Sequence, residues 1–200
     1  MSVHRVGSFL LVGTHLSPSA QCMQVLDSEL KLKDTRYGWY MSDVGGQVVY
    51  EHGMRHFSPT HPMMLSLYDP KTKSETEVYP LRPDKQREEF IDQLKHLAGF
   101  ERCEGPNCSL MPEEFQSSIV EIASNETTRS FAFIAEFDPD GYVRNPQNSD
   151  LIAKVLYVCR MTADGIEQRE FPAEEMKSRF GTEQVNELLV RNVLMRVFGD

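Results

Sequence analysis

The chain has 200 residues, of which 40 % are hydrophobic and 26 % charged, and its formal net charge at pH 7 is −9. This composition is too apolar for wholesale disorder, and the length suits one domain better than two. The negative charge argues against nucleic acid or an anionic membrane as partner, because both select for a cationic surface. We therefore expect one soluble domain over residues 1–200, without a transmembrane helix.

The first apolar run of the chain, Phe9–Val12, is interrupted by Gly13, Thr14 and His15. A signal peptide needs roughly 7–15 apolar residues, so this run is more simply interpreted as a buried strand.

The next segment predicts a tight hairpin. Residues 37–42 and 47–51 flank the sequence Asp43-Val44-Gly45-Gly46. Paired glycines supply the positive φ that such a turn requires.

A second hairpin is predicted directly after it. Apolar residues alternate over 63–68, the turn Asp69-Pro70-Lys71-Thr72-Lys73 follows, and 75–79 forms the next strand. We expect Met63, Leu65 and Leu67 to lie on one face of this sheet.

The second half of the chain repeats this pattern. Residues 119–123 and 130–137 flank a polar turn, and residues 154–160 and 166–171 flank Thr162-Ala163-Asp164-Gly165. Each half therefore predicts about four short antiparallel strands, with the side chains of Val155, Tyr157 and Cys159 on one face.

An internal repeat of 37–80 and 117–172 is suggested by a shift of 92 residues, which needs no gap between the aligned positions. The shift aligns Trp39 with Phe131, Tyr50 with Tyr142, Leu65 with Tyr157, Tyr79 with Phe171 and Pro80 with Pro172. Identity between the two segments is low, so a duplication and a coincidence of two hairpin pairs both stay open.

A helix is expected after each half, over 84–98 and 182–198. In the second helix Thr182 is the expected cap, and the core face is formed by Val185, Leu188, Leu189, Val193 and Val197. Further apolar residues extend around this helix at Val190, Leu194, Met195 and Phe198. This excess of apolar surface predicts self-association or binding of another protein.

The segment Met63-Met64-Leu65-Ser66-Leu67-Tyr68-Asp69-Pro70-Lys71-Thr72 through Tyr79-Pro80 resembles the outer hairpin of a β-propeller blade. In such blades a strand ends in an Asp-centred turn that carries a Lys or Thr, and the outermost strand follows. Residues 156–171 look like a second, degenerate copy. The resemblance implies four-stranded antiparallel blades and surfaces used mainly for binding.

About two blades are countable, whereas propellers have four to eight. The chain would therefore be a piece of a longer propeller, close by self-association, or have another β-rich fold. The expected fold class is mostly β, with antiparallel four-stranded, blade-like sheets and two α-helices.

Cys103 and Cys108 bracket Glu-Gly-Pro-Asn, a turn sequence that brings two sulfurs together. A disulfide there would suit an extracytoplasmic compartment, whereas two free thiols would say nothing of location. The sequence leaves both alternatives open.

The chain has no linear catalytic motif, which favours a non-enzymatic binding module. The alternative is a metal-binding protein or metal-dependent enzyme using His52, His56 and His61, because three imidazoles within ten residues can bind zinc, copper or iron. Trp39 and Tyr40 point to opposite faces of their strand, so one of them is a candidate for an exposed ligand-binding aromatic. No cofactor is indicated by the sequence.

Overall fold

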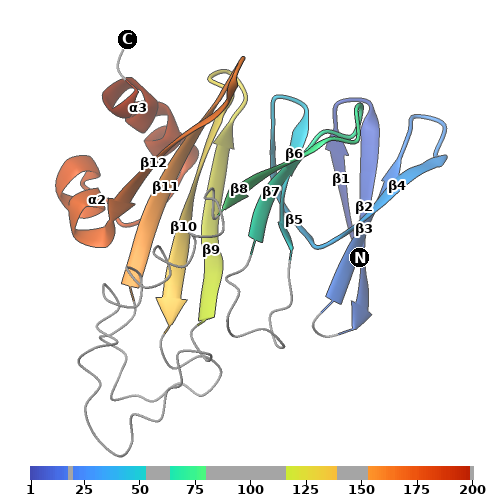
Figure 1. The fold of residues 1–200 in the computed structure, drawn as a ribbon, viewed down its shortest axis with the longest axis horizontal. Helices are drawn as coiled ribbons and strands as arrows, with labels where there is room; N and C mark the ends of the chain where they lie inside the picture. Colours follow the sequence, from blue (N-terminus) through green and yellow to red (C-terminus); the bar gives the residue numbers. More distant parts are fainter. Residues whose placement is uncertain (18–19, 53–63, 80–115, 139–152, 199–200) are drawn as a thin grey trace, which may run out of the picture.

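The computed structural model describes residues 1–17, 20–52, 64–79, 116–138 and 153–198. Within these ranges the chain forms three four-stranded antiparallel sheets followed by two helices (Figure 1). In each sheet the strands lie in chain order, so every sheet is a simple meander. The mostly antiparallel β class expected from the sequence is confirmed.

The three sheets are named A, B and C in chain order. Sheet A consists of β1 (Ser2–Val6), β2 (Phe9–Ser17), β3 (Ala20–Leu26) and β4 (Leu32–Tyr37). Sheet B consists of β5 (Trp39–Val44), β6 (Gln47–His52), β7 (Met64–Tyr68) and β8 (Glu75–Tyr79). Sheet C consists of β9 (Gln116–Asn125), β10 (Ser130–Asp138), β11 (Ala153–Thr162) and β12 (Gly165–Pro172). The helices are α2 (Ala173–Phe180) and α3 (Glu187–Val197).

The hairpins predicted between residues 37 and 80 are confirmed. Gly45 and Gly46 form the β5–β6 turn with φ of 60° and 74°. In the β7–β8 turn the carboxylate of Asp69 accepts hydrogen bonds from the backbone N–H groups of Lys71 and Thr72. The paired glycines and the Asp-centred turn therefore act as the sequence predicts.

Sheet A was not predicted as a sheet. The sequence-based count of about two blade-like sheets was therefore wrong, since the described residues form three. Its β3–β4 turn has no Gly or Pro: the Asp27 carboxylate accepts hydrogen bonds from the N–H groups of Glu29 and Lys31, and Leu30 takes a φ of 62°. A turn built on one aspartate and a strained leucine carries a weak sequence signal.

The layers are ordered sheet A, sheet B, sheet C and helices (Figure 1). One buried cluster lies between sheets A and B, around Leu11, Met23 and Tyr68. A second, aromatic cluster lies between sheets B and C, and a third lies between sheet C and the helices. Leu65 and Leu67 share the second cluster, as do Val155, Tyr157 and Cys159, which confirms both predicted faces for the described residues. Met63 lies outside them.

Neighbouring sheets stack with corresponding strands over one another. Between sheets A and B, His4 of β1 stacks on Tyr40 of β5 at 3.7 Å between ring centroids. Between sheets B and C, Ser42 of β5 hydrogen-bonds Ser124 of β9 at 2.8 Å between hydroxyl oxygens. Fourth strands also meet, since Gln168 of β12 donates to the carbonyl oxygen of Val78 in β8. First strand thus faces first strand, and last faces last.

Sheets A and B are joined by a single residue, Gly38, whose N–H donates to the carbonyl oxygen of Gln21 at 2.8 Å. Its φ is 146°, and a Cβ at this position would collide with the carbonyl oxygen of Glu51. The close stacking of the two sheets therefore requires glycine here.

The C-terminal helix differs from its predicted phase and start. Asn186, not Thr182, caps α3: its side-chain oxygen accepts the N–H of Leu189 at 2.7 Å. Val190 is fully buried against sheet C, whereas Leu188 is 66 % exposed. Both placements in the sequence interpretation were wrong, because a later helix start rotates the face that meets the sheet. The side chains of Leu194 and Met195 and the predicted helix 84–98 lie outside the described residues.

Of the anchors that suggested a repeat, Leu65 and Tyr157 both lie in third strands, and Tyr79 and Phe171 both lie in fourth strands. Trp39 lies in a first strand and Phe131 in a second. Tyr142 lies outside the described residues. The repeat of 37–80 and 117–172 stays a prediction.

Candidate functional site

The outward side of sheet A is an apolar surface that the described elements leave uncovered. Strand pairing places eleven side chains on it: Val3, Arg5, Leu10, Val12, Thr14, Cys22, Gln24, Leu26, Leu32, Thr35 and Tyr37. We call these residues the outer face. None belongs to the three buried clusters. In Figure 1 no described helix or strand lies beyond it.

Three apolar side chains of this face are well exposed. Val3 is 57 % exposed, Leu32 58 % and Tyr37 71 %. Large contiguous apolar patches on a protein surface usually mark an interaction site. The face is also free of acidic residues, in a chain whose net charge is −9. Its single charged residue, Arg5, donates from Nε to the carbonyl oxygen of Gly7 at 3.3 Å.

A polar cluster closes the seam between sheets A and B at their fourth strands. The Arg36 guanidinium lies 4.5 Å from the ring centroid of Tyr68, and its two terminal nitrogens pair with Asp34 at 3.1 Å and Glu75 at 3.2 Å. The Tyr68 hydroxyl donates to Asp34 at 2.8 Å. Lys73 donates to the carbonyl oxygen of Lys33 at 2.8 Å. These contacts hold β4 onto β7 and β8.

The electrostatics of this cluster are those of a structural network. Burial opposes ionisation of Asp34, but the hydroxyl of Tyr68, the N–H of Thr35 and the charge of Arg36 outweigh it and lower the pKa of Asp34. Burial and the bond to Asp34 raise the pKa of Tyr68 to about 12. Asp34 is therefore a stable anion, and Tyr68 stays a neutral donor.

His52, Ser66 and Glu75 lie together beside this cluster and carry the residue types of a catalytic triad. The His52 Nε2 atom is 2.8 Å from the Ser66 hydroxyl and 3.8 Å from the Glu75 carboxylate. A triad needs the hydroxyl and the carboxylate on different ring nitrogens, so that one orients the imidazole while the other is activated. Ser66 is also 1 % exposed. This geometry does not support nucleophilic catalysis by Ser66.

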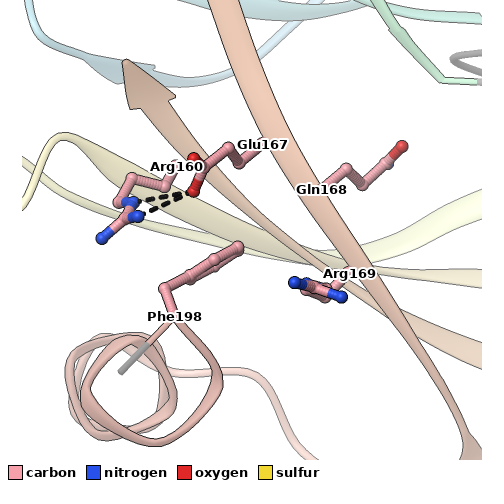
Figure 2. Close-up of a pocket in the computed structure, with 5 residues that line it drawn as sticks. All are labelled: Arg160, Glu167, Gln168, Arg169 and Phe198. Carbon is pink, nitrogen blue, oxygen red and sulfur yellow. Dashed lines mark hydrogen bonds and ion pairs between the residues drawn. The ribbon is translucent and has the colours of Figure 1, made fainter. Parts of the chain in front are cut away.

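A shallow cavity of ≈ 360 Å³ lies at the edge of sheet C, where β12 meets the end of α3. Figure 2 shows Phe198 beside Arg160, whose guanidinium lies 4.9 Å from the Phe198 ring centroid. Arg160 also holds Glu167 at 2.7 Å, so the cavity's one carboxylate is already paired. Gln168 and Arg169 complete the lining. The lining supplies no nucleophile and no unpaired carboxylate base.

The two aromatics proposed from the sequence, Trp39 and Tyr40, lie at the start of β5, and a ligand-binding role for either stays a prediction. Tyr40 faces sheet A, where it stacks on His4 and donates its hydroxyl to Asp43. Burial, and then this bond, raise the pKa of Tyr40. Trp39 is half-buried at the start of β5. Tyr40 therefore acts in packing between the sheets, and the exposed aromatic of this region is Tyr37.

Of the histidine group, His52 is described and His56 and His61 lie outside the described residues. The described ranges contain no cluster of three or more side chains suited to hold a metal ion. The metal-binding alternative stays a prediction. Cys103 and Cys108 also lie outside the described residues, whereas Cys22 and Cys159 are free and buried in different sheets.

The outer face was missed in the sequence, although one signal for it was present. A strand with one solvated side alternates apolar and polar residues, whereas a strand covered on both sides is continuously apolar. Phe9, Leu10, Leu11 and Val12 are continuously apolar. Phe9 and Leu11 face sheet B, and Leu10 and Val12 lie on the outer face. The run therefore indicated a strand with two apolar faces, each suited to pack against another element.

The chain matches no protein-family model, and neither the curated proteins nor the solved structures gave a match. Among the described residues, neither helix is long and apolar enough to cross a membrane.

Proposed function

We propose that this chain is a non-enzymatic interaction module that binds a protein partner through the outer face. The observation that carries the proposal is the apolar side of sheet A, which no described element covers, whereas the other sheet faces are packed within the described part of the chain. Burying such a surface contributes roughly 25 cal/mol for each Å² of apolar area removed from water.

The arrangement of the sheets supports this proposal and specifies the kind of surface that would fit. Consecutive four-stranded meanders stacked first strand on first strand and last on last are the way propeller blades pack. The outer face is the side of sheet A opposite its contact with sheet B, and its most exposed apolar side chains are Val3, Leu32 and Tyr37. A partner with an apolar β-sheet face is therefore the best match.

The chemistry of the polar clusters also favours binding over catalysis. Across the A–B seam Asp34 accepts the Tyr68 hydroxyl and Arg36 pairs with Glu75. Ser66 is buried with its hydroxyl on His52. Each of these groups has a structural partner. The outer face, in contrast, has apolar side chains that no described element covers.

Site-specific photo-crosslinking tests the proposal. Tyr37, which is 71 % exposed, is replaced by a photoreactive phenylalanine analogue, and the protein is irradiated in its native host. Leu188 on α3 is the matched control, since it is 66 % exposed at the opposite end of the stack. We expect a discrete protein adduct at position 37, absent at 188 and lost when Gln24→Glu is added. Equal adducts at both positions, or none at 37, would overturn the proposal.

A further inference from the structure

We infer that the partner of the outer face is a second copy of this chain, joined to the first through a two-fold axis. The inference rests on the proposed function and names its partner. In the resulting dimer two sheets A meet face to face, giving six stacked sheets with helices at each end.

The chemistry of the two end surfaces of the stack determines which symmetry an oligomer of this chain can have. At the far end the exposed side of the helices carries three ion pairs: Lys177 with Glu183, Arg179 with Glu175, and Arg191 with Glu187. A charged surface of this kind is a poor partner for apolar strands. Head-to-tail stacking is therefore disfavoured, and only two outer faces can satisfy each other. Such an isologous contact closes at two copies and leaves no face for a fibre.

The area of the face is sufficient for a dimer, though a weak one. Four strands spaced ~4.8 Å apart and about six residues long cover roughly 19 Å by 20 Å, or about 400 Å² of flat area. With side-chain relief, two such faces bury about 1,000 Å² of accessible surface, the lower limit of a specific interface. We therefore expect a dissociation constant in the micromolar range.

The charge distribution gives this dimer a recognisable salt dependence. Each copy carries a net charge of −9, so two copies repel each other at long range. The outer face itself has one cation and no acidic residue, so the contact adds no close acid–acid repulsion. Raising the salt concentration screens the long-range repulsion and leaves the apolar contact intact. Dimerisation should therefore strengthen with salt.

Light scattering of the full chain after size exclusion tests the inference over about 1–300 µM, a range that brackets a micromolar dissociation constant. We expect the mass to rise from 22.9 kDa towards twice that value. Gln24→Glu places a carboxylate at the centre of the outer face without changing side-chain size, and should weaken the dimer at least tenfold. Tyr37→Ser should weaken it as well. Gln184→Glu makes the same charge change beside α3 and should leave the dimer unchanged.

Both substituted glutamines are exposed, so each variant should keep its circular dichroism spectrum. A monomer at all concentrations would overturn the second copy as partner, as would a dimer sensitive to Gln184→Glu and not to Gln24→Glu. The proposed function fails separately, if position 37 gives no adduct in the cell. An adduct there with a different protein would sustain the binding surface and overturn self-association.

Discussion

The two ends of the sheet stack have the same strand topology and differ in what covers their outward faces. Sheets A and C are both four-stranded antiparallel meanders that pack one face against sheet B. The other face of sheet C is covered by α2 and α3 of the same chain. The other face of sheet A is covered by no described element, and its members Val3, Leu32 and Tyr37 are more than half exposed.

Under the proposed function, this difference separates residues that stabilise the fold from residues that bind a partner. At the covered end, apolar side chains stabilise the fold, because they leave water when the chain folds. At the open end, similar side chains are left in water by the described elements, and in the proposed complex they leave it on association. Substitutions at the covered end should therefore change the free energy of unfolding, and substitutions at the open end should change association. The following predictions test this difference.

The largest expected effect is a loss of stability at the covered end. Met176 of α2 is 1 % exposed, so Met176→Ala leaves a cavity and should lower the free energy of unfolding by about 2–5 kcal/mol. Leu32→Ala at the open end, where the side chain is 58 % exposed, should change it by less than about 0.5 kcal/mol. Urea unfolding at low protein concentration measures both. Equal losses of unfolding free energy in the two variants would contradict the proposed difference between the two ends.

The second effect concerns the seam through which sheet A is attached. Tyr68→Phe removes the hydrogen bond to the Asp34 carboxylate and should cost about 1–2 kcal/mol, because bonds to charged groups are the stronger ones. Tyr37→Phe removes an exposed hydroxyl from the outer face and should cost less than about 0.5 kcal/mol. Thermal unfolding of the two variants compares them. A larger loss from Tyr37→Phe would contradict the assigned roles.

A smaller effect tests how the covering helix begins. Asn186→Ala removes the side-chain cap of α3 and should lower the free energy of unfolding by about 1 kcal/mol. Asn192→Ala, at an exposed position inside the same helix, should be neutral or slightly stabilising because alanine has the higher helix propensity. If both variants lost the same stability, the cap at Asn186 would be wrong.

The hairpins of sheets B and C were predictable because their turns carry strong local signals. Gly45-Gly46 and Asp69-Pro70 restrict the backbone regardless of what packs around them. The sheet A turn at Asp27 depends on one carboxylate and on Leu30 in a conformation that leucine rarely adopts, so it left little trace in the sequence. Local chemistry therefore predicted two sheets out of three.

The candidate site was harder to predict than the fold because it is defined by what does not pack. The alternation of apolar residues predicts which side chains share a face of a strand. Whether another element covers that face depends on how all the sheets and helices pack. Leu188 was assigned to the core and is exposed, while Val190 was assigned outside it and is buried. Both errors follow from the helix start, which depends on the Asn186 side chain and not on apolar spacing.

The smallest expected effect is a pH dependence at the A–B seam. Burial lowers the pKa of His52 below its ordinary value of 6.5, against the opposing charges of Glu75 and Glu77. The unfolded chain therefore binds a proton at His52 more readily than the folded chain does. The stability from the neutral ring is complete above pH 6.5 and falls as the pH drops from 6.5 through the lower folded pKa. His52→Gln removes this titration while retaining a side chain that can hydrogen-bond Ser66.

Melting temperatures at about pH 7.5 and about pH 5.5 measure the effect, since most carboxylates stay ionised across that interval. The wild-type chain should lose more stability towards the lower pH than His52→Gln does. His15→Gln removes an exposed histidine of sheet A and should keep the wild-type pH dependence. If His15→Gln flattened the curve and His52→Gln did not, protonation at the seam would not be the cause. The attachment of sheet A to sheet B would then be insensitive to pH in this range, and the acid-linked loss would belong to the open end.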